Sequence, residues 1–171
     1  MTDTITNNQS VRLQILKAIE ATFLGMTVTG SPTGDPGDPW GVEFSTVEIG
    51  PLIRTDQRKR FSIGIVTGHE TEKFSMPYVM CFLEVNIEFR VTINQGDEDP
   101  GVVLEEMLTV VKRGMIADRQ WGGLAIDTKI TGSEIDLITY ADRAAYGVCV
   151  ATIQYRYDYN DPRSAASPPG A

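Results

Sequence analysis

The chain has 171 residues, of which 42% are hydrophobic and 22% are charged, and this composition is typical of one globular domain. No apolar run approaches the roughly 20 residues of a membrane span, and the opening MTDTITNNQS lacks the basic and apolar regions of a signal peptide. We therefore expect a protein made and kept in a cytosol. The net charge of -8 disfavours tight binding to nucleic acid, because affinity for phosphate backbones comes mainly from Lys and Arg.

The first helix is expected after a flexible N-terminus of residues 1–9. Apolar residues recur at helical spacing in SVRLQILKAIEATFLG, namely at Val11, Ile15, Ala18, Ile19 and Phe23. Ser10 or Asn8 can cap the start of this helix, and Gly25 can end it. Residues 29–41, TGSPTGDPGDPWG, contain three Pro and four Gly. This segment is predicted to be an extended loop.

A long strand is predicted at residues 79–93, after two short strands at 42–50 and 61–68. Every odd position of the long strand is apolar, and its even positions from Glu84 onward are polar, which indicates one buried and one solvated face. At roughly 3.3 Å per residue it would extend about 50 Å, against about 40 Å for the diameter of a compact chain of this length. We expect one end to project as a hairpin arm or to bend over a neighbour.

A second helix is predicted after the polar segment QGDEDPG. Asp99 can cap it and Pro100 can take its first position. We expect it to end near Gly114, with basic residues in its last turn and an apolar stripe of Leu104, Leu108, Val111 and Met115. The acidic residues just before it, Asp97 and Glu98, are interpreted first as part of the helix cap and second as an acidic rim.

Two further strands are predicted at residues 124–138 and 144–159, the first of them with a break or bulge at Gly132. Residues 160–171 are small and Pro-rich and are expected to form a flexible tail. The predicted fold is a single α+β domain over residues 10–159. It contains a largely antiparallel sheet of about four to five strands with two main helices packed on one face.

Catalytic and metal-binding patterns have little support in the sequence. The one histidine, His69, lies in a polar segment without the context of a catalytic triad. Cys81 and Cys149 fall in strand-like runs and are interpreted as buried hydrophobic residues rather than a disulfide or a metal pair. No phosphate-binding loop or zinc-ligand spacing is present. We predict no cofactor and no metal.

Two surface patterns leave alternatives open. The basic run Arg58, Lys59 and Arg60 suits a solvated turn or a salt-bridging contact with an acidic neighbour, and a second copy of this acidic chain is such a neighbour. Tyr155 and Tyr157 lie on one face of the last strand. They suit either core packing with the hydroxyls at its wet edge or an interface strip.

The order of the elements points to a known family. It comprises an amphipathic first helix, a strand in TVEIGP, the long alternating strand, the helix GVVLEEMLTVVKRGM, the segment WGGLAIDTKITGSEID and a last strand running into YRYDYNDP. Over residues 10–162 this order resembles the tail terminator, or tail completion, proteins of long-tailed bacteriophages. The loop at 29–41 is longer and richer in proline than is usual in that family.

The resemblance implies a structural protein rather than an enzyme. Such proteins form a ring, typically hexameric, on the head-proximal end of the tail tube, stop tube polymerisation and present a surface to the head-tail connector or stopper protein. The ring would be part of the virion, assembled in the host cytoplasm. Genomic DNA would pass through it without specific binding, to which an acidic surface is suited.

Within a ring, specific residues become candidates for contact or lumen lining. The polar face of the long strand would supply Glu84, Asn86, Glu88 and Arg90. The loops at 29–41 and 64–76 would project toward the tube or the connector. The candidates also include Asp97, Glu98 and the basic and tyrosine residues named above.

Other functions remain open at this point. The chain could be another neck component, such as a head-closure or head-tail joining protein. It could also be a small cytosolic enzyme that uses carboxylates such as Asp97 and Asp99 with a divalent metal, or an unrelated binding module.

Overall fold

The computed structural model describes residues 8–52, 60–93, 99–136 and 144–165. Its first helix, α1, spans Val11–Leu24, and the Ser10 side chain accepts a 3.1 Å hydrogen bond from the amide of Leu13. Val11, Ile15, Ile19 and Phe23 are all buried. The predicted N-cap and apolar stripe of this helix are therefore confirmed.

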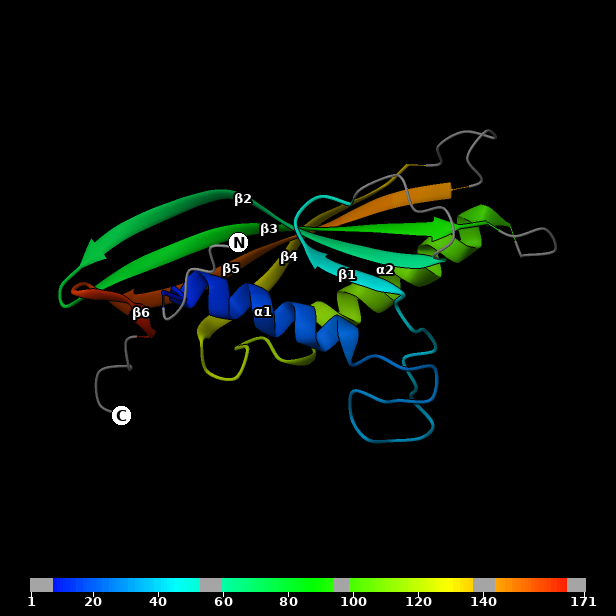
Figure 1. The fold of residues 1–171 in the computed structure, drawn as a ribbon, viewed down its shortest axis with the longest axis horizontal. Helices are drawn as coiled ribbons and strands as arrows, with labels where there is room; N and C mark the ends of the chain where they lie inside the picture. The colour runs from blue at the N-terminus through cyan, green and yellow to red at the C-terminus, as the bar shows by residue number, and fades with distance from the viewer. Residues whose placement is uncertain (1–7, 53–59, 94–98, 137–143, 166–171) are drawn as a thin grey trace, which may run out of the picture.

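Six strands form one mostly antiparallel sheet (Figure 1). Their bounds are β1 Thr46–Ile49, β2 Phe61–Ser75, β3 Tyr78–Thr92, β4 Ala125–Asp136, β5 Ala144–Asp158 and β6 Asp161–Ala165. The order is β1-β2-β3-β5-β4, with β6 pairing to β5, and only the β1–β2 pair is parallel. The α+β fold is confirmed, with six strands rather than four to five.

Both helices cover the same face of the sheet (Figure 1). The second helix, α2, spans Pro100–Ala117 and contacts β3, β4 and β5, whereas α1 contacts β1, β2 and β6. The odd positions of β3 face these helices and are buried from Val79 to Val91. The alternation of the long strand therefore specifies the core, as predicted.

The second helix begins as predicted but ends later. The Asp99 side chain accepts a 3.1 Å hydrogen bond from the amide of Gly101, and Pro100 occupies the first turn. The helix continues past Gly114 to Ala117, because Met115 is still a fully buried member of its apolar stripe. The prediction of basic residues in the last turn is therefore wrong. Arg113 lies four residues before the helix end at Ala117, where it has another role.

The strand before the long strand is much longer than predicted. β2 runs from Phe61 to Ser75, so residues 64–75 form no projecting loop, and β1 is confined to four residues. β2 and β3 pair along their whole length around a turn at Met76 and Pro77, which are joined by a cis peptide bond. Glu70 and Glu72 are accommodated in this strand because their carboxylates accept hydrogen bonds from tyrosine hydroxyls of β5.

Two smaller features close the fold. β4 shifts register between Ile130 and Gly132, which confirms the predicted bulge. Residues 161–165 of the expected flexible tail form β6 instead. β6 is held by pairing with β5 and by a 3.0 Å hydrogen bond from Nε2 of Gln14 in α1 to the carbonyl of Arg163. The rest of that tail, residues 166–171, and residues 1–7 lie outside the described ranges.

Candidate functional site

The most prominent surface feature is the distal half of the β2–β3 hairpin, residues 70–83, here called the hairpin arm. It lies beyond a bulge between Thr67 and Glu70. Figure 1 shows it reaching past the N-terminal end of α1.

The tip of the hairpin arm exposes apolar side chains, since Phe74 is 61% and Met76 69% exposed. The Phe74 ring meets the half-exposed ring of Tyr159 edge-to-face at 4.9 Å. Exposed apolar clusters of this kind mark interaction sites.

The base of the arm is fixed by a polar network. The hydroxyl of Tyr155 donates a 2.7 Å hydrogen bond to Oε2 of Glu70, and Nη1 of Arg12 lies 3.2 Å from Oε1 of the same carboxylate. Burial, reinforced by the hydrogen bond to Glu70, raises the pKa of Tyr155 well above its ordinary range. Burial also raises the pKa of the adjacent Cys81 thiol to about 11. Both groups are therefore neutral at physiological pH.

The candidate tyrosines behave differently from each other. Tyr155 is 2% exposed and faces the helices, so it belongs to the core rather than to an interface strip. The reason is that β5 is an interior strand and that Glu70 satisfies the buried hydroxyl. Tyr157 is only partly buried, and its hydroxyl lies 3.4 Å from Oε1 of Glu72. Only Tyr157 remains a candidate for subunit contact.

The polar face of β3 lies on the side of the sheet opposite the helices. Glu84, Asn86 and Glu88 are half-buried there, and Oε2 of Glu88 accepts a 3.2 Å hydrogen bond from the amide of Leu52. Arg90 is 4% exposed, so it does not line an open surface of the subunit. Its cross-strand neighbours are Ser62 of β2 and Tyr146 of β5.

A shallow pocket of about 260 Å³ occupies the end of this face. Among the described residues, the charged ones that line it are acidic: Glu88, Glu134 and Asp136. Tyr146 and Val148 of β5 form its floor together with Leu52. Only Glu88 of this acidic patch belongs to the predicted polar face of β3, and the patch is a candidate surface for a partner or a lumen.

The other predicted charged residues are only partly described. Arg60 stacks on the ring of Phe61, with its guanidinium carbon 4.9 Å from the ring centroid. Arg58 and Lys59 lie in residues 53–59, and Asp97 and Glu98 lie in residues 94–98, both outside the described ranges. The predicted basic contact and acidic rim therefore stay predictions.

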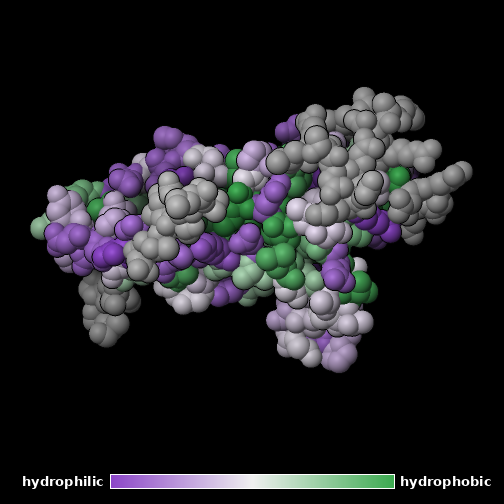
Figure 2. Space-filling model, in the orientation of Figure 1, coloured by the Kyte–Doolittle hydropathy of each residue, from purple (hydrophilic) through white to green (hydrophobic). Residues whose placement is uncertain are grey.

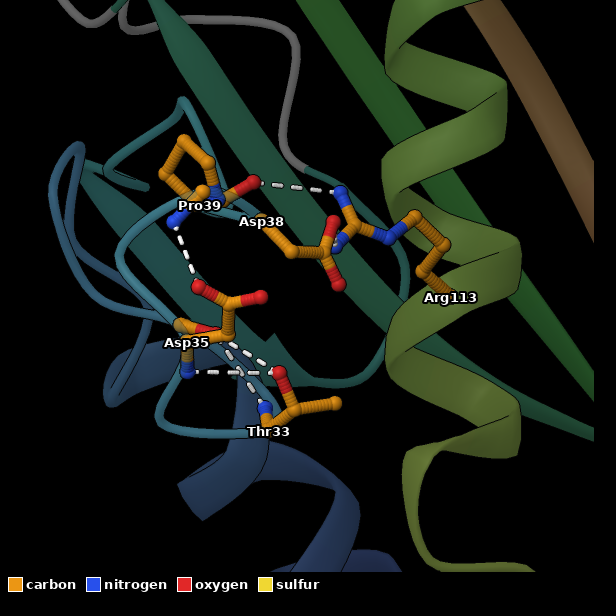
Figure 3. Close-up of polar contacts among 7 residues, drawn as sticks. Thr33, Asp35, Asp38, Pro39 and Arg113 are labelled. Carbon is orange, nitrogen blue, oxygen red and sulfur yellow. Dashed lines mark hydrogen bonds and ion pairs between the residues drawn. The ribbon is translucent and has the colours of Figure 1, made fainter.

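The loop at residues 29–41 is a closed, anchored structure (Figure 3). Its neck is closed by hydrogen bonds from the amide of Trp40 to the carbonyl of Gly30 (2.6 Å) and from that of Gly41 to the carbonyl of Val28 (3.2 Å). Arg113 of α2 anchors the loop through Asp38 and Pro39. In Figure 2 the loop stands away from the body as a separate lobe. It remains a candidate docking element, as predicted.

Arg113 makes three contacts with this loop. Its Nη2 lies 2.7 Å from Oδ1 of Asp38, and its Nη1 donates a 3.2 Å hydrogen bond to the carbonyl of Pro39. Its guanidinium also lies 5.3 Å from the ring centroid of Trp40, which is 8% exposed. A loop with three prolines is thus held in one conformation before any partner arrives, which reduces the entropy lost on binding.

A groove beside β4 was not predicted from the sequence. Its volume is about 410 Å³, and it is lined by Ile116, Arg119, Thr128, Lys129 and Ile130. Ile116 at the end of α2 is 49% exposed. Nη2 of Arg119 lies 2.7 Å from Oδ1 of Asp127. The groove depends on β4 being an outer strand, and no sequence pattern reports the strand order.

The described candidates for enzyme chemistry, His69 and Asp99, have no catalytic arrangement around them, and Asp97 lies outside the described ranges. His69 is exposed on β2 next to the bulge, and Asp99 serves as the cap of α2. Within the described ranges, no three His, Cys, Asp or Glu side chains are grouped as a metal site would need. In the same ranges, no helix combines the length and apolar character needed to cross a membrane.

Comparisons with known proteins leave the family open. A scan of the sequence against models of protein families finds no match. A search of curated proteins also finds no similar sequence.

Proposed function

We propose that the protein is a tail terminator subunit of a long-tailed bacteriophage. In this proposal, copies of the chain form a ring, of six subunits by analogy with the family it resembles, on the head-proximal end of the tail tube. The ring stops tube polymerisation and provides the surface for head attachment. It is a structural part of the virion, assembled in the host cytoplasm, and it uses no cofactor.

The observation that carries the proposal is the hairpin arm with its exposed apolar tip. Phe74 and Met76 are each more than half exposed. A rigid arm that ends in apolar side chains fits a subunit that completes its packing against another chain. The network of Tyr155, Glu70 and Arg12 supports this interpretation, because it fixes the direction in which the arm projects.

Two other surfaces support an assembly role. The anchored loop at residues 29–41 offers a preformed contact for the tail tube protein or for the head-tail connector or stopper. The acidic patch around Glu88, Glu134 and Asp136 suits a surface that genomic DNA passes without binding, because like charges repel the phosphate backbone. Together with the sequence resemblance, these features favour a tail terminator.

Binding to tails and heads tests the proposal directly. The purified protein, labelled with gold, is mixed separately with headless tails and with filled heads, both taken from a mutant of the phage that does not make this protein. Electron microscopy then locates the label. We expect label at one end of the tails. Label on the heads alone would favour a head-closure or head-tail joining protein, and label on neither would contradict a role in the neck.

A further inference from the structure

The sheet has two free edges in the part of the chain that the structure describes. β4 has β5 on one side and no paired strand on the other. β1 pairs with β2 only over residues 62–65, so the outer edge of the hairpin arm is also without a paired strand. A free edge presents backbone N–H and C=O groups that can pair with another chain.

The strand directions make these two edges compatible with each other. The strands β2, β3, β5 and β4 are successively antiparallel. A strand added beside β4 in the same pattern would therefore run in the direction of β2. A second copy of the chain, placed beside the first in the same orientation, presents its β2 with that direction.

The register brings specific residues to the same level. Glu70 of β2 and Thr128 of β4 lie in one row, because paired residues of β3 and β5 connect them. Glu72 and Ala125 share the next row on the same face. A copy that continues the sheet without a shift therefore places its Glu72 near the start of β4. This position is one row before Thr128, where the groove beside β4 begins, and Arg119 lies between the two rows with its ion pair to Asp127.

The two surfaces are also chemically complementary. The groove contains two exposed cations, Arg119 and Lys129, beside the exposed side chain of Ile116. The arm contributes the exposed acid Glu72, followed by exposed Phe74. Asp127 contacts one nitrogen of Arg119, whereas a guanidinium has five N–H donors, so a second carboxylate can be bound.

We propose that the groove beside β4 binds the hairpin arm of a second copy of this chain. Glu72 of one copy pairs with Arg119 of the next, and the apolar tip lies beyond the start of β4, at the level of β6. The contact joins two different surfaces, so its repetition gives a ring when the rotation between copies closes and a filament when it does not. This inference deepens the proposed function and rests on it for ring closure.

Charge exchange between the two surfaces tests the contact. The association of the full chain is measured by light scattering over a range of concentrations for the wild type, Glu72→Arg, Arg119→Glu and the double variant. We expect each single reversal to weaken association about tenfold or more, because it juxtaposes like charges. The double variant should regain most of the loss. Glu106→Arg, an exposed reversal on α2 away from the arm, the groove and the acidic patch, is the matched control and should associate like the wild type.

The outcomes separate this contact from the proposed function. A wild type that stays monomeric, single variants that associate normally, or a double variant that is no better than the singles would overturn the contact. Ile116→Glu blocks the groove at an exposed position and should also prevent association. Recovery in the double variant excludes a folding defect as the cause of the losses in the single charge variants. If these tests fail while the protein still binds tail ends, the contact is wrong and the proposed function stands.

Discussion

The hydroxyl of Tyr155 donates a 2.7 Å hydrogen bond to the carboxylate of Glu70, although the two residues are 85 positions apart in the chain. The same carboxylate meets Arg12 of α1. One half-buried acid thus joins the first helix, the hairpin arm and the last long strand. This link explains how a strand rich in charged residues is held as part of the sheet.

Removing the hydroxyl tests the importance of this link. Tyr155→Phe should lower the free energy of unfolding by about 1.5–3 kcal/mol, the usual contribution of a hydrogen bond to a charged group. Urea denaturation at pH 7 measures it. Tyr157→Phe is the matched control, because its hydroxyl makes only a 3.4 Å contact at the surface, and it should cost less than about 0.5 kcal/mol. Equal losses in the two variants would show that the buried bond has no special role.

The buried thiol beside this link predicts how stability changes with pH. The pKa of Cys81 is raised from 9.0 to about 11 by burial. Between these values the unfolded chain has lost the proton and the folded chain keeps it. Stability should therefore fall as pH rises, by up to about 1.4 kcal/mol per pH unit from this group.

Urea midpoints at pH 8, 9 and 10 measure this dependence. Burial also raises the pKa of Tyr155, whose ionisation adds to the fall in the same direction at the upper end of the range. The Cys81→Ala variant should therefore show a shallower fall than the wild type, not a flat line. A wild-type stability that rises between pH 9 and 10 would contradict the buried thiol.

Arg113 is expected to order the loop at residues 29–41 rather than to stabilise the whole domain. Its ion pair with Asp38 is partly exposed, so Arg113→Ala should cost about 1 kcal/mol or less in global stability. Loss of its contacts with Pro39 and Trp40 should nevertheless speed proteolytic cleavage within the loop. Lys112→Ala, at the neighbouring helix position, should leave the cleavage rate unchanged. Equal cleavage of all three proteins would mean that Arg113 does not anchor the loop.

Gly147 is expected to be required for packing between β3 and β5. A Cβ atom at this position would fall on the ring of Phe89, which is fully buried and cannot move aside cheaply. Gly147→Ala should therefore lower the free energy of unfolding by about 1–3 kcal/mol in urea denaturation. Gly132→Ala is the matched control, because no atom lies within 4 Å of its added Cβ. A similar cost for both variants would argue against this close packing.

The sequence predicted the elements whose signal is local. The alternation in residues 79–93 and the caps at Ser10 and Asp99 depend on neighbouring residues, and the structure confirms them. The distal half of β2 was missed because its acids are satisfied by tyrosines of β5, far away in the sequence. β6 was missed for a similar reason, since its small polar residues are held by β5 and α1.

The candidate site was less predictable than the fold. The burial of Tyr155 and Arg90 depends on which strands flank them, and the sequence does not report that order. The groove at Ile116 and Arg119 exists only because β4 is an outer strand next to the end of α2. The apolar tip of the arm was not predicted, because the sequence did not show where β2 ends and β3 begins.

In the proposed function, this chain ends the growth of a tail tube. The length distribution of tubes assembled from the tail tube protein of the same phage, with and without the purified chain, tests this by electron microscopy. We expect a ring at one end of each tube and an arrest of further growth when fresh tube subunits are added. Tubes that keep growing at both ends, with no ring attached, would contradict it.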